Sequence, residues 1–374
     1  MGWGKAAAVV TASAVGAGVV ALVAGRVVSE ISVRSSGSAP ASVGGLRVHT
    51  VSPERVELTR APETERPGVW ALEWGTDGHV VVGDVLATSA QTVVRAIRPG
   101  MGGTALPAPG ETVVLTPWVL RGDPRSALGM EYSETAVATE LGAMPAWYLP
   151  GLRDPWVIAV HGMGADRAQV LPLLPLFAQF KLPVLSISYR NDPDAPASPD
   201  GIGHFGETEW RDVEAAIRLA VDSGASRVLL YGWGVGATTA LQAAERSPWR
   251  EAVRGLVLDS PVLDFRGSVR RQALRRGVPQ PLAELGMLAA EGRTGVDTAS
   301  FDHLASGDGL HVPALVLHSP DDTIAPIEPV RRLASRRDDL VLFREFPGSE
   351  HEALWNSDPY GYEDILRRFV TPLL

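Results

Sequence analysis

The segment Tyr231–Ala237 has the spacing of a turn that presents a nucleophile, but its central residue has no side chain. In such turns the pattern is G-x-S-x-G, and the sharp passage from strand to helix holds the serine hydroxyl clear of the sheet. Here the letters read G-W-G-V-G, so Gly234 stands at the position of the serine. An apolar run, Arg227–Tyr231, predicts a buried strand before the turn, and Val235–Glu245 predicts a helix after it. The sequence therefore predicts the strand, turn and helix of this motif, but without the serine hydroxyl at position 234.

A carboxylate and an imidazole follow this turn in the order that a nucleophile, acid and base arrangement requires. The apolar run Val312–Leu317 leads into Asp321 and Asp322, and the predicted strand Val341–Phe346 leads into a loop that carries His351. A carboxylate at the end of a strand can orient an imidazole, which then acts as a general base. His351 is the natural base.

Upstream, the predicted strand Trp156–Val160 ends in the sequence H-G-M-G. A loop of this kind can turn its backbone N–H groups toward an oxyanion. The amide that follows the nucleophile position, which belongs to Val235, would supply a second donor.

On these motifs, the chain from about Pro145 to its C-terminus resembles the α/β-hydrolase superfamily, nearest to its monoglyceride-lipase and serine-aminopeptidase-like branch. The resemblance implies an α/β-hydrolase fold, which is a mainly parallel sheet with helices on both faces. The alternation of predicted strands and helices in this region favours the same α/β class. The resemblance also implies the amides of Met163 and Val235 as the oxyanion donors.

The same resemblance assigns the remaining roles position by position. It implies Asp322 as the acid in preference to Asp321, with Asp259 at another strand end as a weaker alternative, and His351 as the base. The family's nucleophile falls on Gly234. Losing the serine of a hydrolase of this type lowers turnover by about 10⁶-fold, because only binding and the oxyanion donors remain.

Four other hydroxyls are candidates for a replacement nucleophile, namely Ser186, Ser188, Ser260 and Thr238. None of them lies on the turn that aims a side chain at the histidine. We interpret them as ordinary polar residues of the fold.

Two function classes follow. The first is a membrane-associated pseudohydrolase or binding protein whose cleft takes a small acyl or ester-type ligand, because Gly234 supplies no nucleophile. The alternative is an active carboxylic-ester or lipid hydrolase in which His351 and Asp322 activate a water molecule, or in which another nucleophile acts. We expect no cofactor and no metal, since the chain has no H-E-x-x-H zinc motif, no phosphate-binding P-loop and no dinucleotide fingerprint.

The front of the chain has a different composition. Residues Ala6–Gly25 carry no charge, and at about 1.5 Å per residue a helix of this length spans a hydrocarbon core of about 30 Å. We therefore expect residues 1–34 to hold a single N-terminal membrane anchor, with the bulk of the chain outside the cytoplasm. The alternative is a cleaved secretory signal, for which Val19-Val20-Ala21 has the required small residues.

Residues 35–45 are rich in Ser, Gly, Ala and Pro and are expected to form a flexible linker. Residues 46–144 are expected to form a small β-rich domain and residues 145–374 the α/β-hydrolase-like domain. The predicted strands of the small domain are Leu46–Val51, Val69–Trp74, His79–Leu86, Thr92–Ile97 and Thr112–Val119. Within the larger domain, 265–309 has helical patterns and forms either a cap over the site or a surface helical pair.

The overall composition is that of a globular protein. The net charge of −9 argues against a nucleic-acid partner, which would favour a basic surface. The chain contains no cysteine, which excludes disulfides and a thiol nucleophile.

Overall fold

The computed structural model of the protein describes residues 45–100, 103 and 105–374. The expected membrane segment, Ala6–Gly25, and the expected linker up to residue 44 lie outside these ranges. Within them, no helix combines the length and apolar character that crossing a membrane requires.

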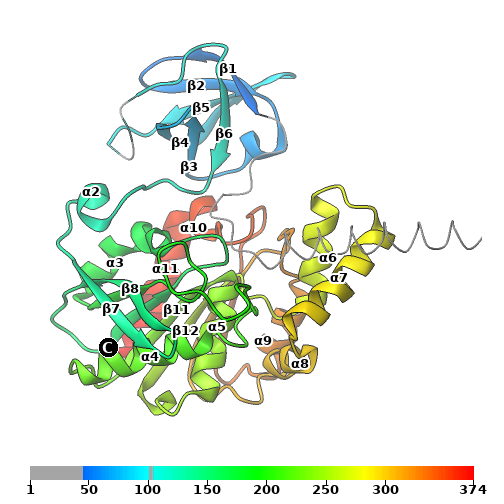
Figure 1. Ribbon diagram of the computed structural model, residues 1–374. Helices are drawn as coiled ribbons and strands as arrows, with labels where there is room; N and C mark the ends of the chain where they lie inside the picture. The colour runs from blue at the N-terminus through cyan, green and yellow to red at the C-terminus, as the bar shows by residue number, and fades with distance from the viewer. Residues whose placement is uncertain (1–44, 101–102, 104) are drawn as a thin grey trace, which may run out of the picture.

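The first part of the described chain is a closed barrel of six strands in the order β1-β2-β5-β4-β3-β6 (Figure 1). All six pairs of neighbouring strands in the barrel are antiparallel. Alternate side chains of each strand point inward and form one apolar core, as expected for a small barrel. The strands are β1 Leu46–Val51, β2 Arg55–Thr59, β3 Trp70–Trp74, β4 Gly78–Thr88, β5 Thr92–Ile97 and β6 Thr112–Thr116. The predicted β-rich region is therefore a barrel, and β2 is a strand that the sequence patterns missed.

The second part is built on an eight-stranded sheet in the order β14-β13-β12-β11-β9-β10-β8-β7. The six strands from β9 onward run parallel to one another, whereas β7 and β8 are antiparallel at one edge. The strands are β7 Ser133–Thr139, β8 Gly142–Leu149, β9 Trp156–Val160, β10 Val184–Ile187, β11 Val228–Trp233, β12 Val253–Asp259, β13 Ala314–His318 and β14 Val341–Glu345. The expected boundary at residue 145 is therefore too late, because β7 and the start of β8 pair with the main sheet and not with the barrel.

Helices cover both faces of this sheet. One face packs against α4 Trp210–Asp222, α5 Gly234–Arg246 and α9 Glu328–Arg336, and the other against α3 Leu174–Phe180 and α11 Pro359–Val370. A parallel sheet buried on both sides explains why its strands read as continuous apolar runs. The remaining helices are α2 Pro124–Leu128, α6 Phe265–Arg275, α7 Gln280–Thr294, α8 Thr298–Ser306, α10 Leu354–Ser357 and the short 3₁₀ turns at Pro62–Glu65, Arg167–Leu173, Arg250–Ala252 and Thr371–Leu373.

Helices α6, α7 and α8 form one group between β12 and β13, which we call the helical insertion (yellow to orange in Figure 1). Their inward side chains, which include Phe265, Val269 and Phe301, form an apolar cluster with Val235 of the turn and Phe205 of a preceding loop. The insertion therefore packs directly onto the turn that contains Gly234.

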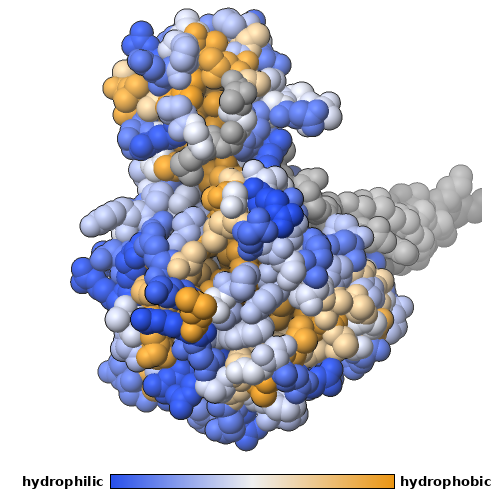
Figure 2. All heavy atoms as spheres, turned by 90° about the vertical axis from the view of Figure 1, so that its left-hand side faces the viewer, coloured by the Kyte–Doolittle hydropathy of each residue, from blue (hydrophilic) through white to orange (hydrophobic). Residues whose placement is uncertain are grey.

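The barrel lies above the short helix α10 and is joined to the larger domain by a narrower waist (Figures 1 and 2). On the face that Figure 2 shows, the larger domain is mainly hydrophilic, with separate apolar patches. The contacts at the waist involve the segment that follows His351.

Candidate active site

Gly234 is the first residue of α5 and has a φ of +50°. A left-handed backbone at this point turns the chain sharply from β11 into the helix, as the G-x-S-x-G turn requires. Its two neighbouring glycines are also needed, because a Cβ at Gly232 would lie 2.5 Å from the Cα of Ala237 and one at Gly236 would overlap the carbonyl oxygen of His161. The backbone of the turn is thus complete, and only the nucleophile is absent.

The space beside Gly234 is filled by the carboxylate of Glu352. A Cβ built at Gly234 would overlap Oε1 of Glu352, would lie 2.8 Å from its Cδ, and would lie 3.0 Å from Nε2 of His351. The last distance shows that a side chain at this position would point at the imidazole. The Glu352 carboxylate therefore stands where a serine side chain would begin.

Each oxygen of this carboxylate has its own donor. Oε1 lies 3.3 Å from Nε2 of His351, and Oε2 accepts a 3.0 Å hydrogen bond from Nε2 of Gln169. The other end of the Gln169 amide accepts a 2.8 Å hydrogen bond from the amide of Gly162, which orients its NH₂ group toward Glu352. A Cβ at Gly162 would overlap the same carboxylate. A Cβ at residue 162 or residue 234 would therefore force the Glu352 carboxylate to shift from this position.

The backbone of Glu352 is also fixed by a hydrogen bond. Its φ is +58°, an uncommon value for a residue with a Cβ, and its amide donates a 3.2 Å hydrogen bond to Oγ of Ser260. The Glu352 side chain is only 15% exposed. No sequence pattern pointed to Glu352 or Gln169, although Glu352 could have been found as the acidic neighbour of the predicted base.

The structure brings the predicted acid and base together. Nδ1 of His351 donates a 2.7 Å hydrogen bond to Oδ2 of Asp322, whose other oxygen accepts hydrogen bonds from the amides of Ile324 and Ala325 at 2.7 and 2.8 Å. Asp321 instead accepts a hydrogen bond from a loop amide beyond β14. Asp322 and not Asp321 therefore orients the imidazole.

His351 lies between two carboxylates, Asp322 and Glu352. Burial opposes a charge on its imidazole, but the two carboxylates outweigh burial and hold the pKa of His351 well above its usual value. This shift favours the form in which both ring nitrogens are protonated. An imidazolium cannot accept a further proton, so the second carboxylate opposes the use of His351 as a general base.

A second histidine flanks Asp322 on its other side. Nε2 of His318 lies 3.6 Å from Oδ2 of Asp322 and 3.2 Å from the carbonyl oxygen of Ala325. Burial lowers the pKa of His318, which is therefore neutral. No sequence pattern predicted a partner for His318, because this contact depends on how the chain folds back after β13.

Below the site, Asp259 at the end of β12 belongs to a separate buried network. Its carboxylate accepts a 2.8 Å hydrogen bond from Oγ of Ser260 and a 2.7 Å hydrogen bond from the hydroxyl of Tyr362, which also contacts the Tyr231 hydroxyl. Burial raises the pKa of Asp259 to about 7. Asp259 therefore supports Ser260, and through it the Glu352 backbone, rather than His351.

The other candidate hydroxyls are engaged elsewhere. Those of Ser186 and Ser188 donate to the carbonyl of Arg167 and the carboxylate of Asp194, at 3.0 and 3.1 Å. Thr238 donates a 2.7 Å hydrogen bond to a carbonyl after β12. None of these bonds joins a hydroxyl to the imidazole of His351.

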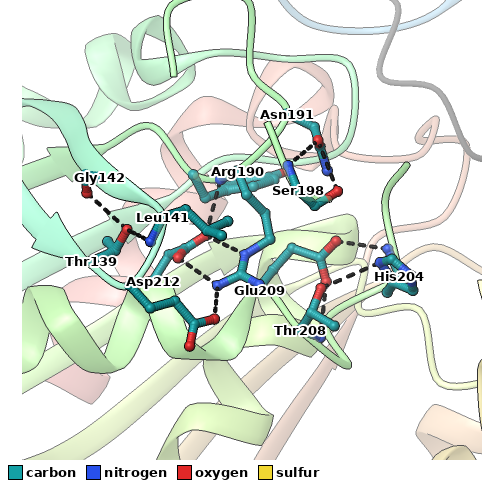
Figure 3. A network of polar contacts seen from close by, with 12 residues as sticks. Thr139, Leu141, Gly142, Arg190, Asn191, Ser198, His204, Thr208, Glu209 and Asp212 are labelled. Carbon is teal, nitrogen blue, oxygen red and sulfur yellow. Dashed lines mark hydrogen bonds and ion pairs between the residues drawn. The ribbon is translucent and has the colours of Figure 1, made fainter. Parts of the chain in front are cut away.

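The loop between β10 and α4 packs beside the turn that contains Gly234. Buried polar contacts hold this loop in place (Figure 3). Arg190 makes 2.8 Å contacts with both oxygens of Asp212, and the carboxylate of Glu209 accepts hydrogen bonds from backbone amides, including that of His204 at 2.7 Å. These bonds satisfy charged groups that would be costly to bury alone. They place Phe205 against the helical insertion, where it forms part of the apolar cluster.

The side chains of the two predicted oxyanion donors, Met163 and Val235, also belong to this apolar cluster. Gly162 and Gly234, which precede them in the chain, both lie against the Glu352 carboxylate. Both loops that would bind an oxyanion therefore face a group that is itself an anion.

Comparison with known proteins separates the two parts of the chain. Residues 47–116, the barrel, match a family model described as a domain of unknown function, DUF8805. A nicotinate-nucleotide–dimethylbenzimidazole phosphoribosyltransferase from Salinispora tropica is 38% identical over 113 residues, which are 28% of this chain and 30% of that protein. Because this match spans less than a third of the relative, the relative's activity is not transferred to this chain.

Solved structures resemble the larger domain. An esterase from Pyrococcus furiosus superposes with a TM-score of 0.55 at 17% identity, covering 67% of this chain and 96% of that one. A serine hydrolase from Cycloclasticus zankles has a TM-score of 0.50 at 15% identity, covering 65% and 99% of the two chains. Likeness at such low identity shows the fold alone. The larger domain has the α/β-hydrolase fold.

Proposed function

We propose that this chain is a catalytically silent α/β-hydrolase-fold protein, a pseudohydrolase that binds a ligand in place of cleaving one. The observation that carries the proposal is the Glu352 carboxylate in the nucleophile space, in contact with His351. A missing serine alone would leave a cavity that water could enter. Here the Glu352 carboxylate fills that space and favours the protonated form of His351, so it opposes both nucleophilic attack and general-base catalysis.

The ligand in this proposal is a small acyl or ester-type molecule. The apolar cluster beneath the helical insertion lies beside the turn, where such a ligand's apolar part would be accommodated. In the structure its members Phe205, Val262 and Val269 are buried against one another. Binding would therefore require the insertion to move as a cap.

The proposal also includes attachment to a membrane through residues 6–25, with the described domains outside the cytoplasm. The uncharged composition of that segment supports it. Fractionation of cells that express the full chain, compared with a chain lacking residues 1–34, tests this part. Retention of only the full chain in the membrane fraction would support an anchor, and release of a shortened chain into the medium would indicate a cleaved signal.

The central test is turnover of short- and medium-chain nitrophenyl esters. The native chain should show none, and Gly234→Ser alone should show little, because the new Cβ overlaps Glu352. Gly234→Ser combined with Glu352→Gly should turn over, since glycine accepts the positive φ at 352 and the serine then faces His351. Adding His351→Ala should abolish that activity.

A second candidate function is favoured by one observation, which is that Glu352 itself lies where the nucleophile should be. In this alternative Glu352 attacks the substrate as a carboxylate nucleophile or activates a water molecule. Ester turnover by the native chain that is lost in both Glu352→Gln and His351→Ala would establish it. The same result would refute the pseudohydrolase proposal.

A further inference from the structure

The segment that carries His351 and Glu352 lies between the active site and the barrel. While His351 and Glu352 point toward Gly234, three nearby residues, Glu350, Ala353 and Asn356, face the barrel. We call residues 350–356 the site segment. One side of the site segment therefore contacts the active site, and the other side contacts the barrel.

Hydrogen bonds join the far end of the site segment to the barrel. Nδ2 of Asn356 donates hydrogen bonds to the backbone carbonyl oxygens of Val69 and Pro117, at 3.0 and 2.9 Å. The backbone carbonyl oxygen of Asn356 accepts a 2.7 Å hydrogen bond from the amide of Val69. The approach is close, because a Cβ at Gly68 would overlap the Asn356 carbonyl. Asn356 is 5% exposed, so these bonds are sheltered from water.

Ion pairs hold the first residue of the site segment, Glu350. Glu350 pairs with Arg66 of the barrel and lies 3.6 Å from Arg275 of α6 in the helical insertion. Between the two ends, Ala353 is 2% exposed and packs into the barrel's own apolar core. The barrel therefore contacts the site segment at its start, middle and end.

We propose that the barrel acts as a lock on the site, holding the site segment so that Glu352 stays in the nucleophile space. This proposal rests on the proposed function, because it treats Glu352 as the group that silences the site. The backbone at Glu352 has a positive φ, which a free loop would tend to relax. Anchors on both sides of that residue, at Glu350 and at Ala353 and Asn356, resist this relaxation. Partial release of the barrel would then withdraw Glu352 and expose the imidazole.

The test uses the full chain with Arg66→Ala and Asn356→Ala combined, which removes the charged contact and the two side-chain hydrogen bonds. Arg98→Ala is the matched control, because Arg98 pairs with Asp84 within the barrel and does not reach the site segment. Circular dichroism melting verifies that each variant is folded. The first readout is the pKa of His351, from nuclear magnetic resonance of histidine-labelled protein.

If the barrel holds Glu352 in place, the double variant loses one of the two carboxylates beside His351, and the pKa of His351 falls by about one unit or more. The other ionisable groups near His351 are Asp322 and His318, which follow or end β13, and Asp259, which ends β12. None of them is touched by these changes. Arg98→Ala should leave the pKa of His351 unchanged. An unchanged pKa in a folded double variant would overturn the proposal.

The second readout is labelling by a serine-directed phosphonate in a Gly234→Ser background. Releasing the barrel contacts should raise the labelling rate about tenfold, as a shift of about one pKa unit would imply, but should have no such effect when Glu352→Gly is also present. An equal increase in both backgrounds would show that the barrel does not act through Glu352. Absence of labelling in Gly234→Ser with Glu352→Gly would refute the intact acid–base geometry in the proposed function, and the pKa readout would still decide on the lock.

Discussion

The acid–base half of the site and its nucleophile half have been altered to very different extents. On the acid–base side, Asp322 and His351 keep a 2.7 Å hydrogen bond, and Asp322 is fixed by backbone amides. On the other side, Gly234 keeps the backbone of the turn, while the space for its side chain belongs to Glu352.

The charge of Glu352 couples the nucleophile half of the site to the acid–base half. The carboxylate that fills the nucleophile space also contacts the imidazole, so a change in one half alters the protonation of the other. Restoring a hydroxyl alone would leave both carboxylates beside His351. Four predictions test how far the two halves can be separated and how the groups beneath them titrate.

The first concerns the acid in a reactivated site. In the variant with Gly234→Ser and Glu352→Gly, adding Asp322→Asn should lower ester turnover by about 10⁴-fold, the loss seen when the acid of a serine protease triad is changed in this way. Asp321→Asn and Asp259→Asn should each leave most of the turnover, because neither carboxylate hydrogen-bonds to His351. A comparable loss with Asp259→Asn would mean that the wrong carboxylate has been assigned.

The second concerns stability. Gly234→Ser in the native background should lower the free energy of unfolding by about 2–4 kcal/mol, combining left-handed strain with overpacking against Glu352. With Glu352→Gly present, only the strain of about 1–2 kcal/mol should remain. Urea unfolding of the four proteins measures this coupling, and equal costs in the two backgrounds would place Glu352 outside the nucleophile space.

The third concerns the protonation of His351. Glu352→Gln should lower the pKa of His351 by about 1–3 units, since one of two neighbouring negative charges is removed. A histidine with a raised pKa contributes stability that is complete below its unfolded pKa and is lost as pH rises through the folded pKa. The variant should therefore lose that contribution at lower pH than the native chain. Histidine resonances measure the pKa, and Glu345→Gln on β14, which pairs with Arg331, is the control.

The fourth prediction concerns the pH dependence of stability through Asp259. Because burial raises its pKa to about 7, the folded protein binds a proton here that the unfolded chain releases near its usual value of 3.8. This group therefore makes the native protein less stable as pH rises from about 4 to about 7. Asp259→Asn should remove that part of the pH dependence in thermal melts. Asp321→Asn should not, and an unchanged slope in Asp259→Asn would contradict the raised pKa.

Local patterns predicted much of the fold. Buried parallel strands read as apolar runs, so β9 at Trp156–Val160 was predicted with its observed bounds, and β14 differs by a single residue. Sequence patterns did not predict the elements whose position depends on pairing with another strand. The strands β7 and β8 are part polar and belong to the main sheet only because β8 pairs with β10. In the barrel, β2 was missed although its residues alternate between polar and apolar, because the run is only five residues long and only two of them are buried.

The sequence by itself determined the turn without a nucleophile and the order of Gly234, Asp322 and His351 along the chain, because these depend on residue types and spacing. Tertiary structure alone decided what fills the vacant position. Gly162 and Gln169 follow β9, whereas Glu352 follows β14, and their contact depends on how these two distant segments converge at one edge of the sheet. Tertiary structure also decided that the barrel contacts the segment next to His351. Side-chain space and electrostatic fields are properties of neighbours in three dimensions, which spacing along a chain does not specify.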